Sequence, residues 1–327
     1  DLFSEVCAVA IVSLFENNKH LKGINVFVID DNIQEKNRNR MMKMAEQYGR
    51  NIHFIPLPNP SDFYQDERFT IKSLGHTYAR MILGDIIPEN VERIISLDSD
   101  TMVLDKIDEL WNTDLQGHPI AGVDDCMGKV ALVKTQHLKP DAIHCNAGMY
   151  LIDLSVWRKE NWTEKFHHYI KGLFDKHIAL GGYEEEVITK VVGERMMVLP
   201  PKYNLMTLEQ VFTYKELIRF RQPLRYYTEA QIEEAKKHPV ITHTTNFFYI
   251  RKRIYEENSD HPMRSQYEKY RALTPWRKDP AMTVTPTFKQ KIQKGIWHVM
   301  PKAAAIVAGN FVRNEIRPRL EKKRDDE

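Results

Sequence analysis

The chain has 327 residues, 42% of them hydrophobic and 28% charged, and its formal net charge at pH 7 is +2. This composition is that of a globular protein and excludes a disordered, collagen-like or disulfide-framework class. Only three cysteines occur, and no apolar run approaches the roughly 18 residues of a membrane span, so we expect a cytoplasmic protein in a reducing environment. The chain begins with Asp1 rather than Met, and we expect a fragment whose first strand is missing.

The first third of the chain alternates helix-like and strand-like stretches, which predicts a mostly parallel sheet with helices on both faces. The apolar residues 6–14 open this pattern. A β-branched run at residues 24–29 and a strand-like run at residues 51–57 flank a stretch with helical spacing at residues 34–48. Residues 74–83 are then predicted to form a helix that leads into a ligand-facing loop.

The alternation of helices and strands continues after residue 83. It ends near residue 250, where we expect the main domain to end. Residues 94–103 are predicted to form a buried strand that delivers two carboxylates, Asp98 and Asp100. The other predicted elements are a short helix at 106–111, strands at 120–123 and 147–154, helices at 162–176 and 184–192, a short strand at 196–199 and an extended turn at Pro200-Pro201.

The C-terminal tail differs in character from the rest of the chain. Residues 288–319 mix Lys and Arg with Ile, Trp, Val, Met and Phe, and residues 321–327 are mostly charged. A basic amphipathic segment of this kind suits peripheral contact with an anionic membrane surface. It equally suits a helix that packs on the body of the protein with its charges in solvent. The sequence leaves both hypotheses open.

The segment Asp98-Ser99-Asp100 is the main candidate for chemistry. Ligands of open α/β sheets bind outside the carboxyl ends of the strands, which is where this triplet is predicted to lie. Carboxylates there can hold a hard divalent cation, Mn²⁺ or Mg²⁺, against the diphosphate of a nucleotide sugar. An Asp-x-Asp triplet also occurs by chance as the cap of a turn. A late histidine, His243, is available as a third ligand.

The order of motifs along the chain resembles the family-8 retaining glycosyltransferases, which include glycogenin and bacterial lipopolysaccharide galactosyl- and glucosyltransferases. The resemblance covers residues 1 to about 276 and rests on Ser13-Leu14-Phe15-Glu16-Asn17-Asn18, Tyr78-Ala79-Arg80, Leu97-Asp98-Ser99-Asp100, Asn146-Ala147-Gly148, Pro200-Pro201-Lys202-Tyr203-Asn204 and His243-Thr244-Thr245. It implies an α/β, GT-A-like (Rossmann-like) nucleotide-sugar-binding sandwich over residues 1–276. Residues 277–327 would then be a C-terminal helical extension, basic and amphipathic.

The resemblance also implies a metal centre. In such enzymes the two motif aspartates and a C-terminal histidine bind Mn²⁺, so Asp98, Asp100 and His243 are the expected ligands. An imidazole ligand suits Mn²⁺ better than Mg²⁺, although Mg²⁺ remains an alternative. The other interpretation of His243 is a polar residue that caps the end of an apolar strand.

The donor site follows from the same motifs. Arg253 matches a family arginine whose guanidinium would clasp the diphosphate, although the family's Arg-Pro-Trp is here Arg253-Ile254-Tyr255. The amide of Asn146 would contact the donor sugar, with the small Ala147 and Gly148 letting the backbone approach it. The full expected donor-binding set is Arg80, Asp98, Ser99, Asp100, Asn146, Ala147, Gly148, Glu184 and Arg253. Each also has a plain structural interpretation as a turn or surface residue.

The chain departs from the family pattern at Glu184-Glu185-Glu186, where an Asp-Gln pair is usual. The family glutamine lies near the anomeric carbon, so Glu185 would place a carboxylate there. It could act as a nucleophile or stabilise an oxocarbenium-like transition state. Alternatively, the three glutamates only favour the dipole of a helix start. Glu185 and Asn146 are the candidate catalytic residues.

These expectations combine into a function. We expect a retaining transfer of a hexose from UDP-glucose or UDP-galactose to a saccharide or glycolipid acceptor, in bacterial surface polysaccharide or lipopolysaccharide synthesis, with no nucleic-acid partner. Asp124 and Asp125 would line the acceptor side or simply form a turn. The altered Glu185 leaves open a catalytically weak nucleotide-sugar-binding homologue. The aspartates leave open a metal-dependent phosphohydrolase.

Overall fold

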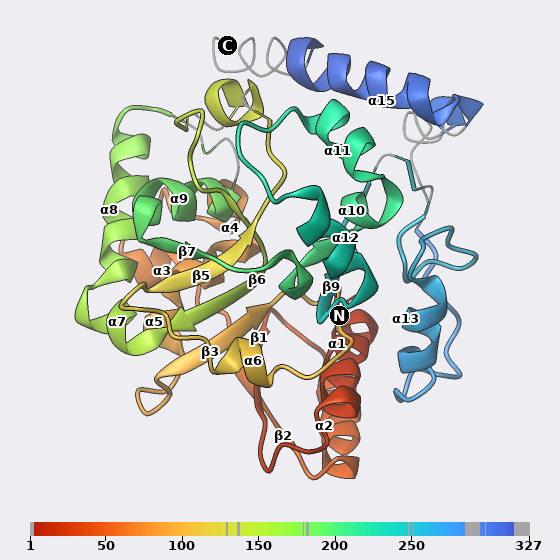
Figure 1. The fold of residues 1–327 in the computed structure, drawn as a ribbon. Coiled ribbons are helices and arrows are strands. Elements are labelled where there is room, and N and C mark those ends of the chain that lie inside the picture. Colours follow the sequence, from red (N-terminus) through yellow and green to blue (C-terminus); the bar gives the residue numbers. More distant parts are fainter. Residues whose placement is uncertain are drawn as a thin grey trace.

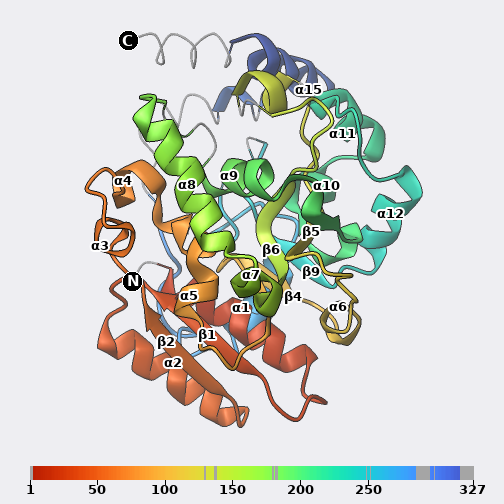
Figure 2. The ribbon, with the colours of Figure 1, turned by 90° about the vertical axis from the view of Figure 1, so that its left-hand side faces the viewer.

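A computed structural model of the protein describes residues 3–316, except residues 129, 136–137, 179, 181–182, 248, 251, 285–294 and 298 (Figure 1). Within this part of the chain the strands form sheets of two, four and three strands. Helices lie on both sides of the strands (Figures 1 and 2). The expected α/β sandwich is therefore present.

The N-terminal part follows the predicted order. The apolar residues form the buried helix α1 (Ser4–Asn17). Strands β1 (Asn25–Asp30) and β2 (Asn51–Pro56) pair in parallel through the crossover helix α2 (Glu35–Gln47), which buries Met41, Met44 and Ala45. These three residues recur at the spacing of one helix face, which is why this helix packs against the apolar α1 and the two strands.

The single helix expected at residues 74–83 is not formed. The short helices α3 (Pro60–Tyr64) and α4 (Ile71–Leu74) come first, and α4 ends at Gly75, whose φ of +75° lies in the left-handed region. The chain then tightens into the 3₁₀-helix η1 (His76–Ile82) before α5 (Leu83–Ile86). Gly75 breaks the helix because a glycine adopts this backbone conformation without a steric cost.

The four-stranded sheet has the order β3, β6, β5, β7, from Arg93–Leu97, Cys145–Asp153, Ile120–Asp124 and Met196–Val198. Strand β6 runs antiparallel to both neighbours, whereas β5 and β7 are parallel. The expectation of a mostly parallel sheet is wrong for this sheet. Asp124 at the end of β5 lies opposite Cys145 at the start of β6, so the connection between them returns to the same end and reverses the chain.

The three-stranded sheet joins distant parts of the sequence. It contains β4 (Thr101–Val103), β9 (Ile241–His243) and β8 (Leu205–Met206), with β9 in the middle. Strand β9 is antiparallel to β4 and places His243 opposite Thr101. Because Thr101 follows Asp100 directly, this register brings the expected metal ligands to one end of the pair.

Helices complete the two sides of the molecule. On one side Trp157, Phe166 and Ile170 pack in the largest cluster of buried side chains. The helices and short helical turns not yet named are α6 (Asp108–Trp111), η2 (Ala131–Thr135), α7 (Leu154–Lys159), α8 (Trp162–Asp175), α9 (Tyr183–Val192), η3 (Gly193–Arg195), η4 (Pro201–Tyr203), α10 (Thr207–Val211), α11 (Tyr214–Arg221), α12 (Glu229–Lys237) and α13 (Arg264–Arg271). Helix α13 is held to α1 by a buried ion pair in which Arg271 Nε lies 2.7 Å from Glu5 Oε1.

The described part of the C-terminal tail packs on the body. Helix α15 (Lys302–Phe311) lies along α11 at the top of the molecule and continues into the short π-helix η5 (Val312–Ile316) (Figures 1 and 2). Ile306 is 2% exposed among apolar side chains, and Lys302 Nζ lies 2.7 Å from Glu216 Oε2. Residues 288–294, 298 and 317–319 of the predicted amphipathic segment lie outside the described residues. The domain division at residue 276 stays a prediction.

Candidate active site

The single strand predicted at residues 94–103 is instead two strands, β3 and β4, and the aspartate triplet lies in a tight turn between them. Asp98 N–H donates to the carbonyl of Gly148 at 3.0 Å, and Thr101 Oγ1 donates to the carbonyl of Asp98 at 2.8 Å. The carbonyl of Asp100 accepts from Thr244 N–H at 3.0 Å and from Thr244 Oγ1 at 2.6 Å. Strand β6 and the residue after β9 therefore fix both aspartates. Ser99 stands between them and is partly exposed.

The three expected metal ligands come together. His243 Nε2 lies 3.4 Å from Asp98 Oδ2 and 3.2 Å from Asp100 Oδ1, and one ligand atom from each residue falls within 4.8 Å of the others. Two carboxylates and an imidazole form a donor set that suits Mn²⁺. These side chains could hold a divalent cation with open positions left for phosphate oxygens.

The charges of this cluster are strongly coupled. Burial works to raise the pKa of Asp100, but the hydrogen bond and charge of His243 and the charge of Arg253 outweigh it, so this pKa lies below its usual value. Burial works to lower the pKa of His243, but Asp100 and Asp98 raise it above the usual value. The aspartates thus stabilise the charged imidazole, and the imidazole stabilises the charged form of Asp100. A divalent cation would compete with a proton on His243 for the same atoms.

Gly148 is required by the position of His243. A Cβ at residue 148 would lie 2.1 Å from His243 Nδ1 and 2.5 Å from Cε1 of the same ring, which is far below any real contact. The imidazole thus rests against the backbone of β6. We expected the small residues Ala147 and Gly148 to admit a donor sugar. In the structure both are buried, and the group that approaches Gly148 is the imidazole.

Arg80 connects the aspartate turn to the glutamates of α9. Its guanidinium is buried, with Nη1 2.5 Å from Glu184 Oε1 and Nη2 in contact with Asp98 Oδ1. Thr77 Oγ1 donates to the other oxygen of Glu184 at 2.5 Å. Arg80 therefore lies at the site, as expected, but its terminal nitrogens already bind protein carboxylates. A direct contact of Arg80 with the donor stays a prediction.

Glu185 lies beside the Asn146-Ala147-Gly148 motif. Its Oε1 accepts from Ala147 N–H at 2.8 Å and from Asn146 Nδ2 at 3.1 Å, while Oε2 lies 3.9 Å from His144 Nε2. Burial, with the nearby charges of Asp125 and Glu184, raises the pKa of Glu185 to about 8. Glu185 is therefore mostly a neutral carboxylic acid at pH 7. In that form it is close in shape to the amide that is usual in the family.

Arg253 reaches the cluster from the other side. Its Nη1 lies 3.9 Å from Asp100 Oδ2, and its side chain is 36% exposed. Its backbone N–H donates to Glu256 Oε1 at 2.6 Å, which anchors the segment that carries it. A partly exposed guanidinium beside a metal ligand can still fork onto phosphate oxygens. A clasp of the diphosphate by Arg253 stays a prediction.

The sequence did not point to three further buried residues of the site. Asn204 Nδ2 donates to Asn146 Oδ1 at 3.0 Å, and His144 Nδ1 lies 2.9 Å from Thr189 Oγ1. Asn204 belongs to the motif Pro200-Pro201-Lys202-Tyr203-Asn204, but the family resemblance assigned no function to this residue. His144 and Thr189 had no local signal, because their partnership depends on the packing of α9 against β6.

A second acidic group borders the same region. Asp124 lies 3.2 Å from Arg225 through its Oδ2, and burial raises its pKa to about 7. Glu209 accepts from Tyr226 OH at 2.8 Å, and burial raises its pKa to about 7 as well. Asp125 N–H donates to the carbonyl of His144. Whether this group serves an acceptor or only the turn after β5 stays a prediction.

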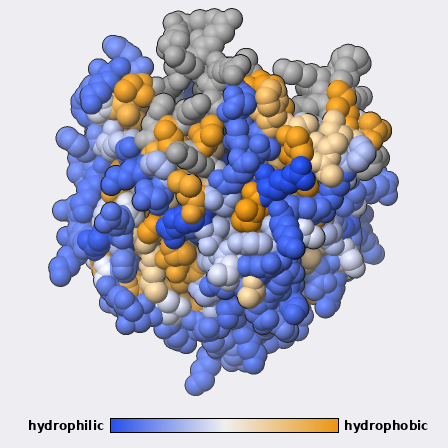
Figure 3. Space-filling model, turned by 45° about the horizontal axis from the view of Figure 1, so that its top comes forward, coloured by the Kyte–Doolittle hydropathy of each residue, from blue (hydrophilic) through white to orange (hydrophobic). Residues whose placement is uncertain are grey.

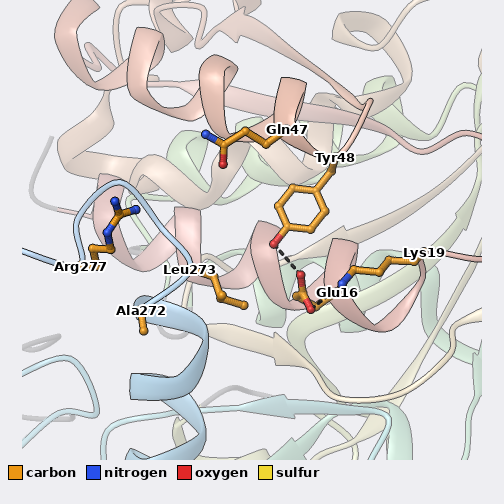
Figure 4. Close-up of a pocket in the computed structure, with 7 residues that line it drawn as sticks. All are labelled: Glu16, Lys19, Gln47, Tyr48, Ala272, Leu273 and Arg277. Carbon is orange, nitrogen blue, oxygen red and sulfur yellow. Dashed lines mark hydrogen bonds and ion pairs between the residues drawn. The ribbon is translucent and has the colours of Figure 1, made fainter.

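A shallow hollow of about 490 Å³ lies elsewhere on the molecule (Figure 4). It is lined by Glu16, Lys19, Gln47, Tyr48, Ala272, Leu273 and Arg277. Glu16 accepts from Tyr48 OH at 2.6 Å and pairs with Lys19 at 2.9 Å, as the dashed lines in Figure 4 show. These polar groups satisfy one another, and no metal ligand lines the hollow. It is not a candidate for the active site.

In the described residues, the helices are too short or too polar to cross a membrane.

Comparison with solved structures defines the class of the protein. It is similar to the galactosyltransferase LgtC in complex with donor and acceptor sugar analogues, with a TM-score of 0.66 and 18% identity over 90% of this chain and 97% of that chain. It is also similar to the bifunctional glycosyltransferase WbbM, with a TM-score of 0.68 and 19% identity over 85% of this chain and 49% of that chain. The fold is that of the GT-A glycosyltransferases.

The chain belongs to glycosyl transferase family 8, whose sequence model matches residues 2–245. General stress protein A of Bacillus subtilis (strain 168) is 25% identical over 266 residues, which are 81% of this chain and 88% of that protein. A putative glycosyltransferase of Haemophilus influenzae is 32% identical over 224 residues, which are 65% of each chain. The family resemblance of the sequence motifs is thus confirmed, as is the expected fold.

Proposed function

We propose that the protein transfers a hexose from UDP-glucose or UDP-galactose to a saccharide or glycolipid acceptor with retention of the anomeric configuration. The observation that carries this proposal is the meeting of Asp98, Asp100 and His243 at the end of β4 and β9. In a glycosyltransferase of this fold, such a cluster suits the diphosphate of a nucleotide sugar. Mn²⁺ is the proposed cation, with Mg²⁺ as the alternative.

The residues around the cluster have roles that follow from their places. When bound, a divalent cation supplies positive charge that neutralises the departing diphosphate. Arg253 would hold the same diphosphate from the exposed side. Asn146 would contact the hexose, as the family motif implies. Glu185, as a neutral acid, would present a hydrogen-bond donor near the anomeric carbon rather than a nucleophile.

On this route the acceptor hydroxyl attacks from the face that the diphosphate leaves, and its proton passes to the leaving phosphate. No protein base is then required, which agrees with a Glu185 that is mostly neutral. A place in bacterial surface polysaccharide or lipopolysaccharide synthesis is part of this proposal, and bacterial relatives are named as glycosyltransferases. The three free cysteines support a reducing, cytoplasmic setting.

The test is a donor screen with full-length protein and Mn²⁺ that measures UDP release and the anomer of the product. We expect release from a UDP-hexose, an α-configured product and loss of both with Asp98→Asn. Release that requires no added saccharide would favour a hydrolase. Binding of UDP without any release would favour the inert homologue. Either result would overturn the proposed transfer.

We also propose that the C-terminal extension makes peripheral contact with an anionic membrane. On α15 and η5 the apolar side chains of Val307, Phe311 and Val312 are 49%, 56% and 40% exposed. Figure 3, which looks onto the top of Figure 1, shows apolar residues gathered beside hydrophilic ones on this face. Lys302, one of the basic residues of this segment, binds Glu216 on the body. The apolar residues would therefore make the contact, with the basic residues that follow them attracting the surface.

Vesicle flotation tests this contact. Full-length protein should float with vesicles that contain anionic lipid, and it should stay at the bottom when residues 288–327 are removed. The double variant Val307→Ser/Phe311→Ser should lose most of the flotation. Leu273→Ser, which changes an apolar residue that is 41% exposed away from this helix, is the matched control. Equal flotation of all forms would contradict the proposed membrane contact.

A further inference from the structure

The amide of Asn146 has a fixed orientation. Its Oδ1 accepts from the backbone N–H of Gly148 at 3.0 Å. A backbone N–H can only donate, so the oxygen, and not the nitrogen, must lie on this side. Asn204 Nδ2 donates to the same oxygen at 3.0 Å. Asn204 is 1% exposed and Asn146 is 8% exposed, so water competes little for these bonds.

The other end of the amide agrees with this orientation. Asn146 Nδ2 donates to Glu185 Oε1 at 3.1 Å, and the same oxygen accepts from the backbone N–H of Ala147 at 2.8 Å. A flipped amide would place two N–H groups against each other at Gly148, whose backbone N–H can only donate. The Gly148 end therefore sets the orientation of Asn146, and the Glu185 end is compatible with it.

This orientation determines the tautomer of His243. His243 Nδ1 lies 2.9 Å from Asn146 Oδ1, which offers only lone pairs. Nδ1 must therefore carry a hydrogen. In a neutral imidazole Nε2 then has the free lone pair, and Nε2 is the atom that faces Asp98 and Asp100 at 3.4 and 3.2 Å. The opposite tautomer would direct a hydrogen at the cation position and could not bind there.

The imidazole has little freedom to escape this arrangement. Its ring rests on Gly148, where even a Cβ would lie 2.1 Å from Nδ1. His243 is also 6% exposed at the end of β9, where its backbone pairs with Thr101 and Met206. The ring plane is thus set by packing, and the tautomer is set by one hydrogen bond.

We infer that Asn146 is a positioning residue that holds His243 in the tautomer with hydrogen on Nδ1, so that Nε2 can bind the divalent cation, and that Asn204 holds Asn146 for this task. This inference rests on the proposed metal site. It gives Asn146 a role beyond the donor-sugar contact that the family motif implies. Groups that orient a metal-ligating histidine typically matter for affinity by about 10- to 100-fold.

The test measures Mn²⁺ binding by electron paramagnetic resonance, in which free Mn²⁺ gives a signal that bound Mn²⁺ loses. Asn146→Ala should weaken binding by about 10- to 100-fold relative to wild type. Asn90→Ala, at an exposed turn residue, is the matched control and should bind Mn²⁺ as wild type does. Circular dichroism of the metal-free proteins reports whether each variant folds.

A rescue separates positioning from general structural damage. Asn146→Asp keeps an oxygen that accepts from Gly148 N–H and from His243 Nδ1, and so preserves the tautomer. Its Mn²⁺ affinity should therefore stay near the wild-type value, whereas that of Asn146→Ala should fall. Should Asn146→Ala fail to fold, Asn204→Ala carries the same test, because it removes a donor from the same oxygen, and weaker binding is again expected.

The outcomes are distinct. If wild-type protein does not bind Mn²⁺, the proposed metal site fails and this inference fails with it. If wild type binds but Asn146→Ala binds equally well, only the positioning role is overturned. If Asn146→Ala weakens binding and Asn146→Asp weakens it equally, the hydrogen bond to Nδ1 is not the cause, and the inference is again overturned.

Discussion

Replacing Glu185 by Gln should make the protein more stable at alkaline pH. Burial raises the pKa of Glu185 from 4.5 to about 8 in the folded protein. Between these values the folded state keeps a proton that the unfolded chain has released, so the free energy of unfolding falls as pH rises through this window. The difference between these two pKa values lowers the free energy of unfolding by at most about 5 kcal/mol, at roughly 1.4 kcal/mol per pKa unit. Because 27% of the side chain is exposed, solvent screening reduces this, and we expect about 2–3 kcal/mol.

Urea unfolding of metal-free protein between pH 5 and 9 measures this effect. The free energies of unfolding of Glu185→Gln and wild type should nearly coincide at pH 5, separate as pH rises and reach a constant gap above about pH 8. Glu89→Gln, on an exposed loop residue, is the matched control and should follow wild type at every pH. A gap between Glu185→Gln and wild type that does not change with pH would refute the reasoning.

Two further substitutions test the packing of the site. Gly148→Ala should lower the free energy of unfolding in urea by about 1–3 kcal/mol and weaken Mn²⁺ binding, because the added methyl overlaps the ring of His243. Gly172→Ala, whose Cβ would have open space, is the control. Equal stability and Mn²⁺ binding of the two variants would contradict this prediction. Arg80→Ala should cost about 3–5 kcal/mol at pH 7, because it leaves Glu184 buried without its cation. Arg80→Lys should lose less, and an Arg80→Ala protein as stable as wild type would show that the pair is not needed.

The metal cluster could be predicted from the sequence because its signals are local and ordered. An apolar strand ending in Asp98-Ser99-Asp100 and a late strand ending in His243 each announce a polar group at a strand end. The structure brings these three ligands together. What the sequence does not contain is the partner of each group. That Gly148 serves the ring of His243, and that Asn204 binds Asn146, follow only from the pairing of segments far apart in the chain.

Two errors of the sequence interpretation have physical causes. The helix expected at residues 74–83 ignored Gly75, whose positive φ ends one helix and lets a 3₁₀-helix begin. The mostly parallel sheet was inferred from the alternation of helices and strands, but the direction of β6 depends on where its preceding connection returns. The alternation of helices and strands alone does not indicate the direction of a strand. In the extension, Lys302 belongs to the face that packs on the body, which the distribution of cations could not indicate.

The short strands β4 and β9 have a consequence for how the site is assembled during folding. The carbonyl of Asp100 and the hydroxyl of Thr244 meet across 144 residues of chain. Closing a loop of that length costs on the order of 4 kcal/mol in chain entropy. Pairing between two strands of three residues offsets little of this cost until the rest of the core has formed. We therefore expect the aspartates and the histidine to meet late on the folding pathway. A cation that binds only the completed cluster would stabilise the folded chain by mass action, so thermal unfolding of this enzyme should shift upward with metal concentration.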